Sequence, residues 1–153
     1  MVSKKKIIDI KKYLNQNTND PDYFDKKNEN LRDVCNYIMK NRSQNSFRTR
    51  LFGFIDEKGL NDVEVYKKAD LTRNVFYCIK KGGNYQVSKK TALKCALSLE
   101  LTIEQTELLL DSAGYSLNRS DPFDLIIMYH LENKIYDIFV INETLNELAG
   151  VIL

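Results

Sequence analysis

Apolar residues recur every three or four positions along most of the chain, which is the spacing of amphipathic helices. Within residues 46–115 this pattern is interrupted at short intervals by residues that begin or end helices. Phe47, Leu51 and Ile55 lie on one face of a helix that Gly59 is expected to end. The sequence therefore predicts a series of short helices, beginning with this one.

Four more short helices are expected after Gly59, each preceded by a residue whose side chain can cap its N-terminus. The expected caps of all five helices are Ser46, Asn61 or Asp62, Thr72, Ser88 and Thr102. Gln105 stands three residues after Thr102, which is the spacing of a capping box. The expected inner faces of the last four helices are Val65, Tyr66 and Ala69; Val75, Phe76 and Ile79; Ala92, Cys95, Ala96 and Leu99; and Leu108, Leu109 and Ala113.

Helical patterns also flank this region on both sides. On the N-terminal side we expect helices over residues 4–15 and 25–40, a loop over 15–23 around Pro21, and a linker over 41–45. The face of the second of these helices is expected to hold Leu31, Val34, Cys35, Ile38 and Met39. On the C-terminal side, residues 120–148 predict two helices separated at Asn133 and Lys134.

These elements predict an all-α protein with three parts. They are a basic N-terminal helical extension (1–45), a five-helix domain (46–119) and an acidic C-terminal helical pair (120–153). The charge balance follows the same division. Residues 1–45 carry ten Lys and Arg against six Asp and Glu, residues 46–120 carry twelve against nine, and residues 121–153 carry one against six. Such a gradient favours a polyanion as the partner of the body, although solvated faces without a partner also explain it.

Other features of the composition narrow the class of protein. Cys35, Cys78 and Cys95 lack the spacing of a zinc or redox motif, and they indicate buried free thiols in a reducing compartment. No apolar run approaches the roughly 20 residues of a membrane span, so we expect a cytoplasmic protein. One histidine and no phosphate-binding glycine loop argue against catalysis, and we expect no enzyme, no metal and no cofactor.

The segment VYKKADLTRNVFYCIKKG, residues 65–82, resembles the helix-turn-helix of lambda-repressor-like and Xre-type proteins, small regulators of bacteria and phages. The resemblance covers about residues 46–115 and implies a five-helix fold. It also implies double-stranded DNA as the partner, with the helix from Thr72 to Lys80 reading the major groove. Asp70 stands where that family usually has a left-handed glycine.

The resemblance implies a set of DNA-binding residues: Thr72, Arg73, Asn74, Tyr77, Lys80, Lys81, Lys89 and Lys90. Arg73, Asn74 and Tyr77 would lie nearest the base edges, since arginine suits guanine and asparagine suits adenine. Thr72 and the lysines would lie near phosphates, with Lys89 and Lys90 beside a helix N-terminus.

Two departures from the family favour an alternative function. Tyr66 replaces a small alanine, and Asp62 replaces a glutamine that would approach a phosphate. These changes are compatible with a protein-interaction adaptor or inhibitor that reuses the helix-turn-helix fold, for instance in a mobile element. RNA binding through the basic N-terminal segment is a third hypothesis.

The C-terminal helices offer apolar residues for a homodimer. The expected oligomerisation residues are Phe123, Ile127, Ile138, Ile141 and Leu145. The second helix has coiled-coil-like spacings of three and four. The alternative is that these helices complete the core of a monomer, or that they meet a different protein.

Overall fold

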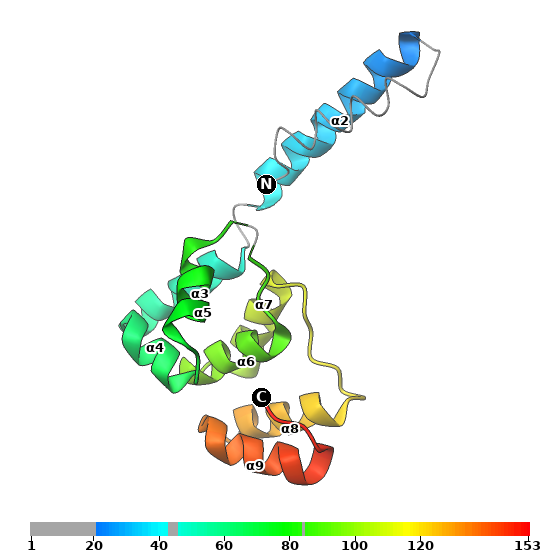
Figure 1. Ribbon diagram of the computed structural model, residues 1–153. Coiled ribbons are helices and arrows are strands. Elements are labelled where there is room, and N and C mark those ends of the chain that lie inside the picture. The colour runs from blue at the N-terminus through cyan, green and yellow to red at the C-terminus, as the bar shows by residue number, and fades with distance from the viewer. Residues whose placement is uncertain (1–20, 43–45, 84) are drawn as a thin grey trace. The chain divides into compact units, whose positions relative to one another are not determined.

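The computed structural model describes residues 21–42, 46–83 and 85–153, and within them it holds eight α-helices and no strand. The prediction of an all-α protein is therefore confirmed for this part of the chain. The helices are α2 (Pro21–Arg42), α3 (Phe47–Lys58), α4 (Asp62–Lys68), α5 (Arg73–Lys81), α6 (Lys89–Ser98), α7 (Ile103–Ser112), α8 (Pro122–Glu132) and α9 (Ile138–Ala149) (Figure 1). The chain divides into two compact units, residues 1–44 and 45–153.

In the first unit, α2 begins earlier and ends later than predicted. Pro21 is its first residue, so the predicted loop is wrong at residues 21–23; proline is well suited to the start of a helix, where its missing N–H is not needed. The helix also includes residues 41 and 42 of the predicted linker. Val34 is 53% exposed, whereas Leu31, Cys35 and Ile38 are half-buried. The expected helix over 4–15 and residues 43–45 lie outside the described residues.

In the second unit, the predicted caps of α3 to α7 are confirmed. Ser46, Asn61, Thr72, Ser88 and Thr102 each accept a hydrogen bond from the backbone N–H three residues later. Asn61 and Thr102 are both part of capping boxes, with Glu64 and Gln105 as the reciprocal partners. These polar caps explain where each helix begins, because they satisfy N–H groups that have no partner inside the helix.

Among the described residues, three helices end in a left-handed residue that is not glycine. Asp70, Glu100 and Lys134 have φ values of 53°, 53° and 56°. The residue after each one donates its N–H to a carbonyl five residues back; for Asp70 this is the bond from Leu71 to Tyr66, 2.9 Å long. The prediction of a left-handed Asp70 is confirmed, and the other two positions repeat the same helix ending.

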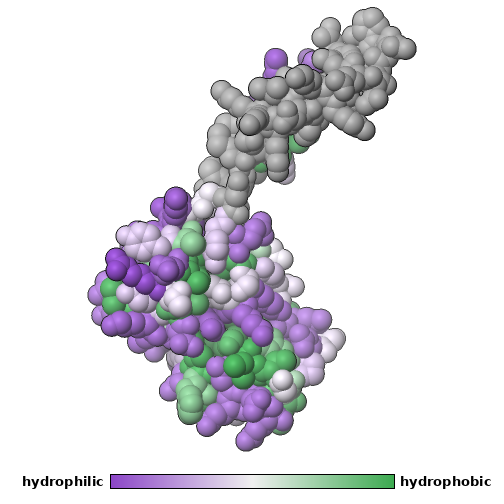
Figure 2. Space-filling view, viewed as in Figure 1, coloured by the Kyte–Doolittle hydropathy of each residue, from purple (hydrophilic) through white to green (hydrophobic). Residues whose placement is uncertain are grey.

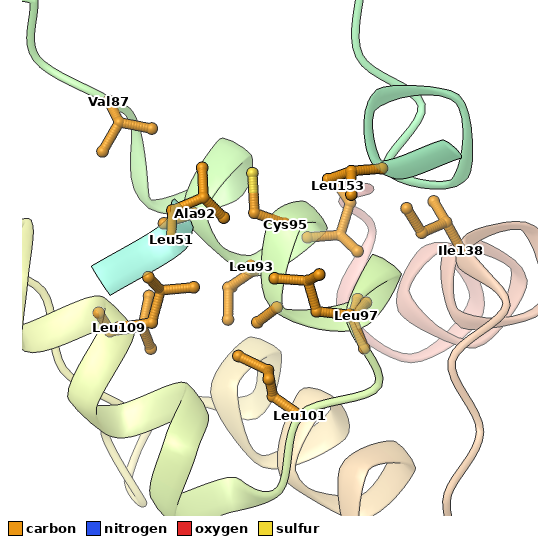
Figure 3. Close-up of a cluster of buried hydrophobic side chains, with 14 of the residues drawn as sticks. Leu51, Val87, Ala92, Leu93, Cys95, Leu97, Leu101, Leu109, Ile138 and Leu153 are labelled. Carbon is orange, nitrogen blue, oxygen red and sulfur yellow. The ribbon is translucent and has the colours of Figure 1, made fainter. Parts of the chain in front are cut away.

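The core of the second unit forms around α6, which packs against α4 and α7. Leu93 and Leu97 of α6 are buried with Leu51 of α3 and Leu109 of α7 (Figure 3). Leu108, expected on the inner face of α7, is 47% exposed, and Leu110 is buried in its place. The buried face of α7 therefore holds Leu109 and Leu110, one residue further along the helix than the predicted Leu108 and Leu109.

The C-terminal pair belongs to the same core. Helices α8 and α9 pack against each other, and α8 also contacts α7 (Figure 1). Ile138 of α9 and the C-terminal Leu153 lie in the cluster that holds Leu97 (Figure 3). The two helices thus close one side of the five-helix bundle with apolar side chains.

Candidate nucleic-acid interface

Helices α4 and α5 are joined by a short turn that is held by short-range interactions at both of its ends. Ala69 ends α4, Asp70 reverses the chain in the left-handed region, and Thr72 caps α5 by accepting from Val75 N–H. Leu71, inside the turn, is half-buried against the core. The turn therefore sets where α5 begins and which of its residues face outward.

The inner face of the pair is apolar and closely packed. Val65 of α4 and Phe76 and Ile79 of α5 have exposed fractions of 0%, 1% and 3%. The ring of Tyr66 lies 5.7 Å from the ring of Phe76, centroid to centroid. Tyr66 thus packs against Phe76 across the two helices.

The outer face of α5 carries most of the predicted DNA-binding residues. Thr72, Arg73, Asn74, Tyr77 and Lys81 are all exposed, and Tyr77 reaches 57%. The Arg73 guanidinium lies over the Tyr77 ring, 5.7 Å from its centroid. A guanidinium that lies against an aromatic ring has a fixed orientation, so it loses less conformational freedom when it binds a ligand. The face therefore presents hydrogen-bonding groups of both arginine and asparagine beside an aromatic ring.

Lys80 is exposed but it is not free. Its ammonium donates to the Asp62 carboxylate at 2.6 Å, linking the last turn of α5 to the first residue of α4. The hydrogen bond with Asp62, and then the charge of Asp62, raise the pKa of Lys80 above its ordinary 10.5. Asp62, whose carboxylate was expected to repel a phosphate, thus neutralises the charge of Lys80, one of the predicted phosphate-binding residues.

Arg48 of α3 reaches the C-terminal end of α5, although the sequence did not single it out. Its Nε donates to the Lys80 carbonyl at 2.5 Å, and its guanidinium lies 5.7 Å from the Phe52 ring centroid. A Cβ at Gly82 would come within 3.1 Å of the Arg48 side chain, so glycine leaves room for it. The pattern of α3 alone places Arg48 outside the apolar face but cannot show that it reaches the end of α5.

Lys89 and Lys90 differ in their surroundings although they are adjacent. Lys89 donates to the fully buried carboxylate of Asp124 at 2.7 Å, and the N–H of Asn118 donates to the same oxygen. Lys89 therefore links α6 to α8. Its ammonium, which was predicted to contact a phosphate, is already bound to a carboxylate of the same chain. Lys90 is exposed and makes no ion pair within the described part of the chain.

The residues expected to form a dimer interface lie inside the chain's own core. Ile127, Ile141 and Leu145 are completely buried, Ile138 is 8% exposed, and Phe123 is half-buried against the core. In this conformation their side chains contact the same chain and are not available to a second copy. The apolar side chains that α9 does expose are others, among them Phe139 at 72% and Leu148 at 71%.

The chain was also compared with known proteins. No protein-family model, no curated protein and no solved structure matches it. No helix among the described residues is long and apolar enough to cross a membrane. Across residues 21–42, 46–83 and 85–153, no group of three or more His, Cys, Asp or Glu side chains could hold a metal ion.

Proposed function

We propose that the protein is a sequence-specific DNA-binding regulator that inserts α5 into a major groove. The observation that carries this proposal is the outer face of α5, where Arg73, Asn74 and Tyr77 are exposed together on a helix anchored by a buried inner face. The major groove of DNA is wide enough to admit a short helix, and polar groups near the N-terminus of that helix can reach the base edges.

Each exposed residue has a role in this proposal. Arg73 donates two hydrogen bonds to a guanine edge and Asn74 bonds an adenine edge. Thr72 and Lys81, at the two ends of α5, contact phosphates and set its register in the groove. Arg48, beside the C-terminal end of α5, adds a guanidinium to the same row of cations.

The proposal assigns no direct DNA contact to Lys89, because its ammonium is bound to Asp124. Lys80 contributes only when its ion pair with Asp62 opens. Regulators with this motif read paired half-sites about 34 Å apart, so a palindromic target read by two copies is expected. A repressor role follows from the same resemblance.

The second candidate function is a protein-interaction adaptor that uses this fold without reading DNA. The observation that favours it is that two of the eight predicted DNA-binding residues, Lys80 and Lys89, are bound to carboxylates. Fewer free cations give weaker attraction to a polyanion. In that function the exposed apolar residues would carry the interaction.

Recovery of DNA fragments from the source genome at low and at moderate salt separates the two candidates. We expect the full chain to recover one short palindromic site at both salt concentrations. A variant with Arg73→Ala and Asn74→Ala should lose that site and keep only weak, salt-sensitive binding to all fragments. Equal recovery of all fragments by both proteins would favour the adaptor.

A further inference from the structure

The C-terminal end of α5 is held by a side chain from a different helix. The last carbonyl groups of a helix have no partner within it. In α5 the N–H of Gly82 donates to the carbonyls of Cys78 and Ile79, at 3.3 Å and 3.1 Å. The carbonyl of Lys80 instead accepts from Arg48 Nε of α3, at 2.5 Å. Arg48 thus acts as a cap for α5, and its positive charge is favourable at this end of a helix.

Aromatic rings connect Arg48 to α5 by a second route. The Arg48 guanidinium lies 5.7 Å from the ring centroid of Phe52. The Phe52 ring in turn packs edge-on against the ring of Phe76 in α5, 5.9 Å from centroid to centroid. Phe76 is only 1% exposed, so its ring is fixed by the core. The guanidinium therefore has a fixed orientation while it holds the backbone of α5.

Gly82 leaves room for the Arg48 side chain. A Cβ at Gly82 would lie 3.1 Å from Arg48 Cδ and 3.8 Å from its Nε. A Cβ at Gly83 would meet nothing within 4 Å. Both glycines are left-handed, with φ values of 70° and 73°. The two positions therefore both strain a residue with a Cβ, but only the first affects Arg48.

The contact between Arg48 and Lys80 lies at the surface, where both residues are exposed. The largest hydrophobic area in Figure 2 is elsewhere on this unit, where Figure 1 marks the C-terminus. The bond joins α3 to the backbone of α5, so its loss affects the placement of the whole helix end. Binding groups must be held to within about 0.5 Å of their productive positions. The placement of α5 is therefore a requirement for base contacts by Arg73 and Asn74.

We propose that Arg48 is a positioning residue for DNA reading, because its bond to the Lys80 carbonyl fixes the orientation of α5. That orientation sets where Arg73 and Asn74 meet the base edges. This inference rests on the function proposed for α5. It gives Arg48 a role that depends on the geometry of its guanidinium, in addition to its positive charge. Lysine keeps that charge but lacks the Nε donor, so a substitution can separate the two roles.

Arg48→Lys in the full chain makes this separation. Affinities for the recovered DNA site and for a scrambled duplex are measured over a range of salt concentrations. The slope of log affinity against log salt concentration should stay unchanged, because the charge is kept. Discrimination between the two duplexes should fall about threefold to tenfold, which corresponds to the loss of one hydrogen bond. Arg119→Lys, at an exposed position outside α3 and α5, is the matched control and should change neither quantity.

Gly82→Ala and Gly83→Ala test the same contact from the side of α5. Both substitutions place a Cβ on a left-handed residue, but only the one at Gly82 displaces Arg48. Gly82→Ala should therefore lower discrimination more in the wild type than in a protein that also carries Arg48→Ala. Gly83→Ala should have the same effect in both proteins, since it does not interact with Arg48.

Hydrogen exchange tests the anchoring of α5 without DNA. In Arg48→Lys the amides of Lys81 and Gly82, at the end of α5, should exchange about threefold to tenfold faster than in the wild type. The amide of Gly150, at the end of α9, donates to Asn146 and should exchange at the wild-type rate in the variant.

Several results would overturn the proposal. Arg48→Lys with wild-type discrimination and wild-type exchange would leave Arg48 no role beyond its charge. Lower stability in urea together with wild-type discrimination would limit Arg48 to folding. Equal effects of Gly82→Ala with and without Arg48→Ala would also contradict it. A wild-type protein that does not discriminate between duplexes contradicts the function proposed for α5, whereas faster exchange in Arg48→Lys still supports the anchoring, so the two failures are distinguishable.

Discussion

The Lys80 ammonium lies 2.6 Å from the Asp62 carboxylate, and this contact joins the end of α5 to the start of α4. Both side chains are exposed at the edge of the surface that we propose faces DNA. The carboxylate holds one cation away from phosphates while its own charge opposes a polyanion. Asp62 is therefore a residue whose removal should strengthen DNA binding.

Asp62→Asn tests this relationship. The substitution frees Lys80 for a phosphate and removes a negative charge, so DNA affinity should rise. The slope of log affinity against log salt concentration should steepen by about one phosphate contact. Salt titrations of binding to a fixed duplex measure both quantities. Glu57→Gln, an exposed carboxylate near the end of α3, is the matched control. An unchanged salt slope for Asp62→Asn would show that Lys80 does not reach DNA.

Lys89→Met tests whether Lys89 acts in folding. Asp124 is completely buried, and the substitution removes the Lys89 ammonium that pairs with it. The Asp124 Oδ2 then keeps only the N–H of Asn118 as a described partner, and its Oδ1 has none. We expect a loss of about 3 kcal/mol in the free energy of unfolding, measured in urea. Adding Asp124→Asn should restore most of that loss, because the amide carries no charge. A single variant as stable as the wild type would contradict this role.

Asp70→Gly should stabilise the protein. Asp70 adopts a φ of 53°, which costs an ordinary residue about 1 kcal/mol or more and costs glycine nothing. Allowing for the greater freedom of glycine in the unfolded chain, we expect a gain of about 0.5 kcal/mol. Glu107→Gly, at an exposed position in the middle of α7, should instead destabilise by roughly 0.5 kcal/mol. Urea denaturation of both variants measures the contrast, and equal losses would show that residue 70 is not strained.

The buried thiol of Cys95 should make the free energy of unfolding depend on pH. Burial raises the pKa of its thiol from 9.0 to about 12, against a smaller opposing effect of Lys94. Between these values the unfolded chain loses a proton that the folded chain keeps. The contribution of the protonated Cys95 thiol to the free energy of unfolding is therefore complete below pH 9. Above pH 9 the free energy of unfolding falls by up to about 1.4 kcal/mol per pH unit.

The measurement is urea denaturation between about pH 8 and pH 10 of the wild type and of Cys95→Ala. The alanine variant lacks the thiol, whereas the raised pKa of Lys80 affects both proteins alike above pH 10.5. The difference in stability between wild type and variant should shrink as pH rises past 9. Parallel curves would contradict the assignment to Cys95.

Local features of this chain could be predicted from the sequence because their causes are local. Ser46, Thr72 and Thr102 cap helices through hydrogen bonds to residues three positions away. The left-handed conformation of Asp70 follows from its place in a helix ending. The predicted loop at Pro21 is wrong because proline both interrupts helices and begins them, and only the residues around it decide which.

Contacts between distant residues could not be predicted in the same way. Lys89 and Asp124 are 35 residues apart, and Arg48 and Lys80 are 32 apart. Such pairs depend on the angles at which helices pack, which an apolar stripe does not determine. The same limit explains Ile141 and Leu145: their spacing identifies an apolar face, but it cannot say whether that face meets its own chain or a second copy.

Discrimination between DNA sequences by α5 is the central claim, and one comparison tests it most directly. The affinities of the full chain for the recovered site and for a scrambled duplex are measured by fluorescence anisotropy at one salt concentration. The double variant Arg73→Ala with Asn74→Ala is compared with Arg119→Ala with Asn146→Ala, a control of matched residue types at exposed positions outside α5. Because each base contact contributes about 1–3 kcal/mol, the α5 variant should lose at least about 30-fold in discrimination, and the control should lose none. Equal discrimination by wild type and both variants would contradict the account.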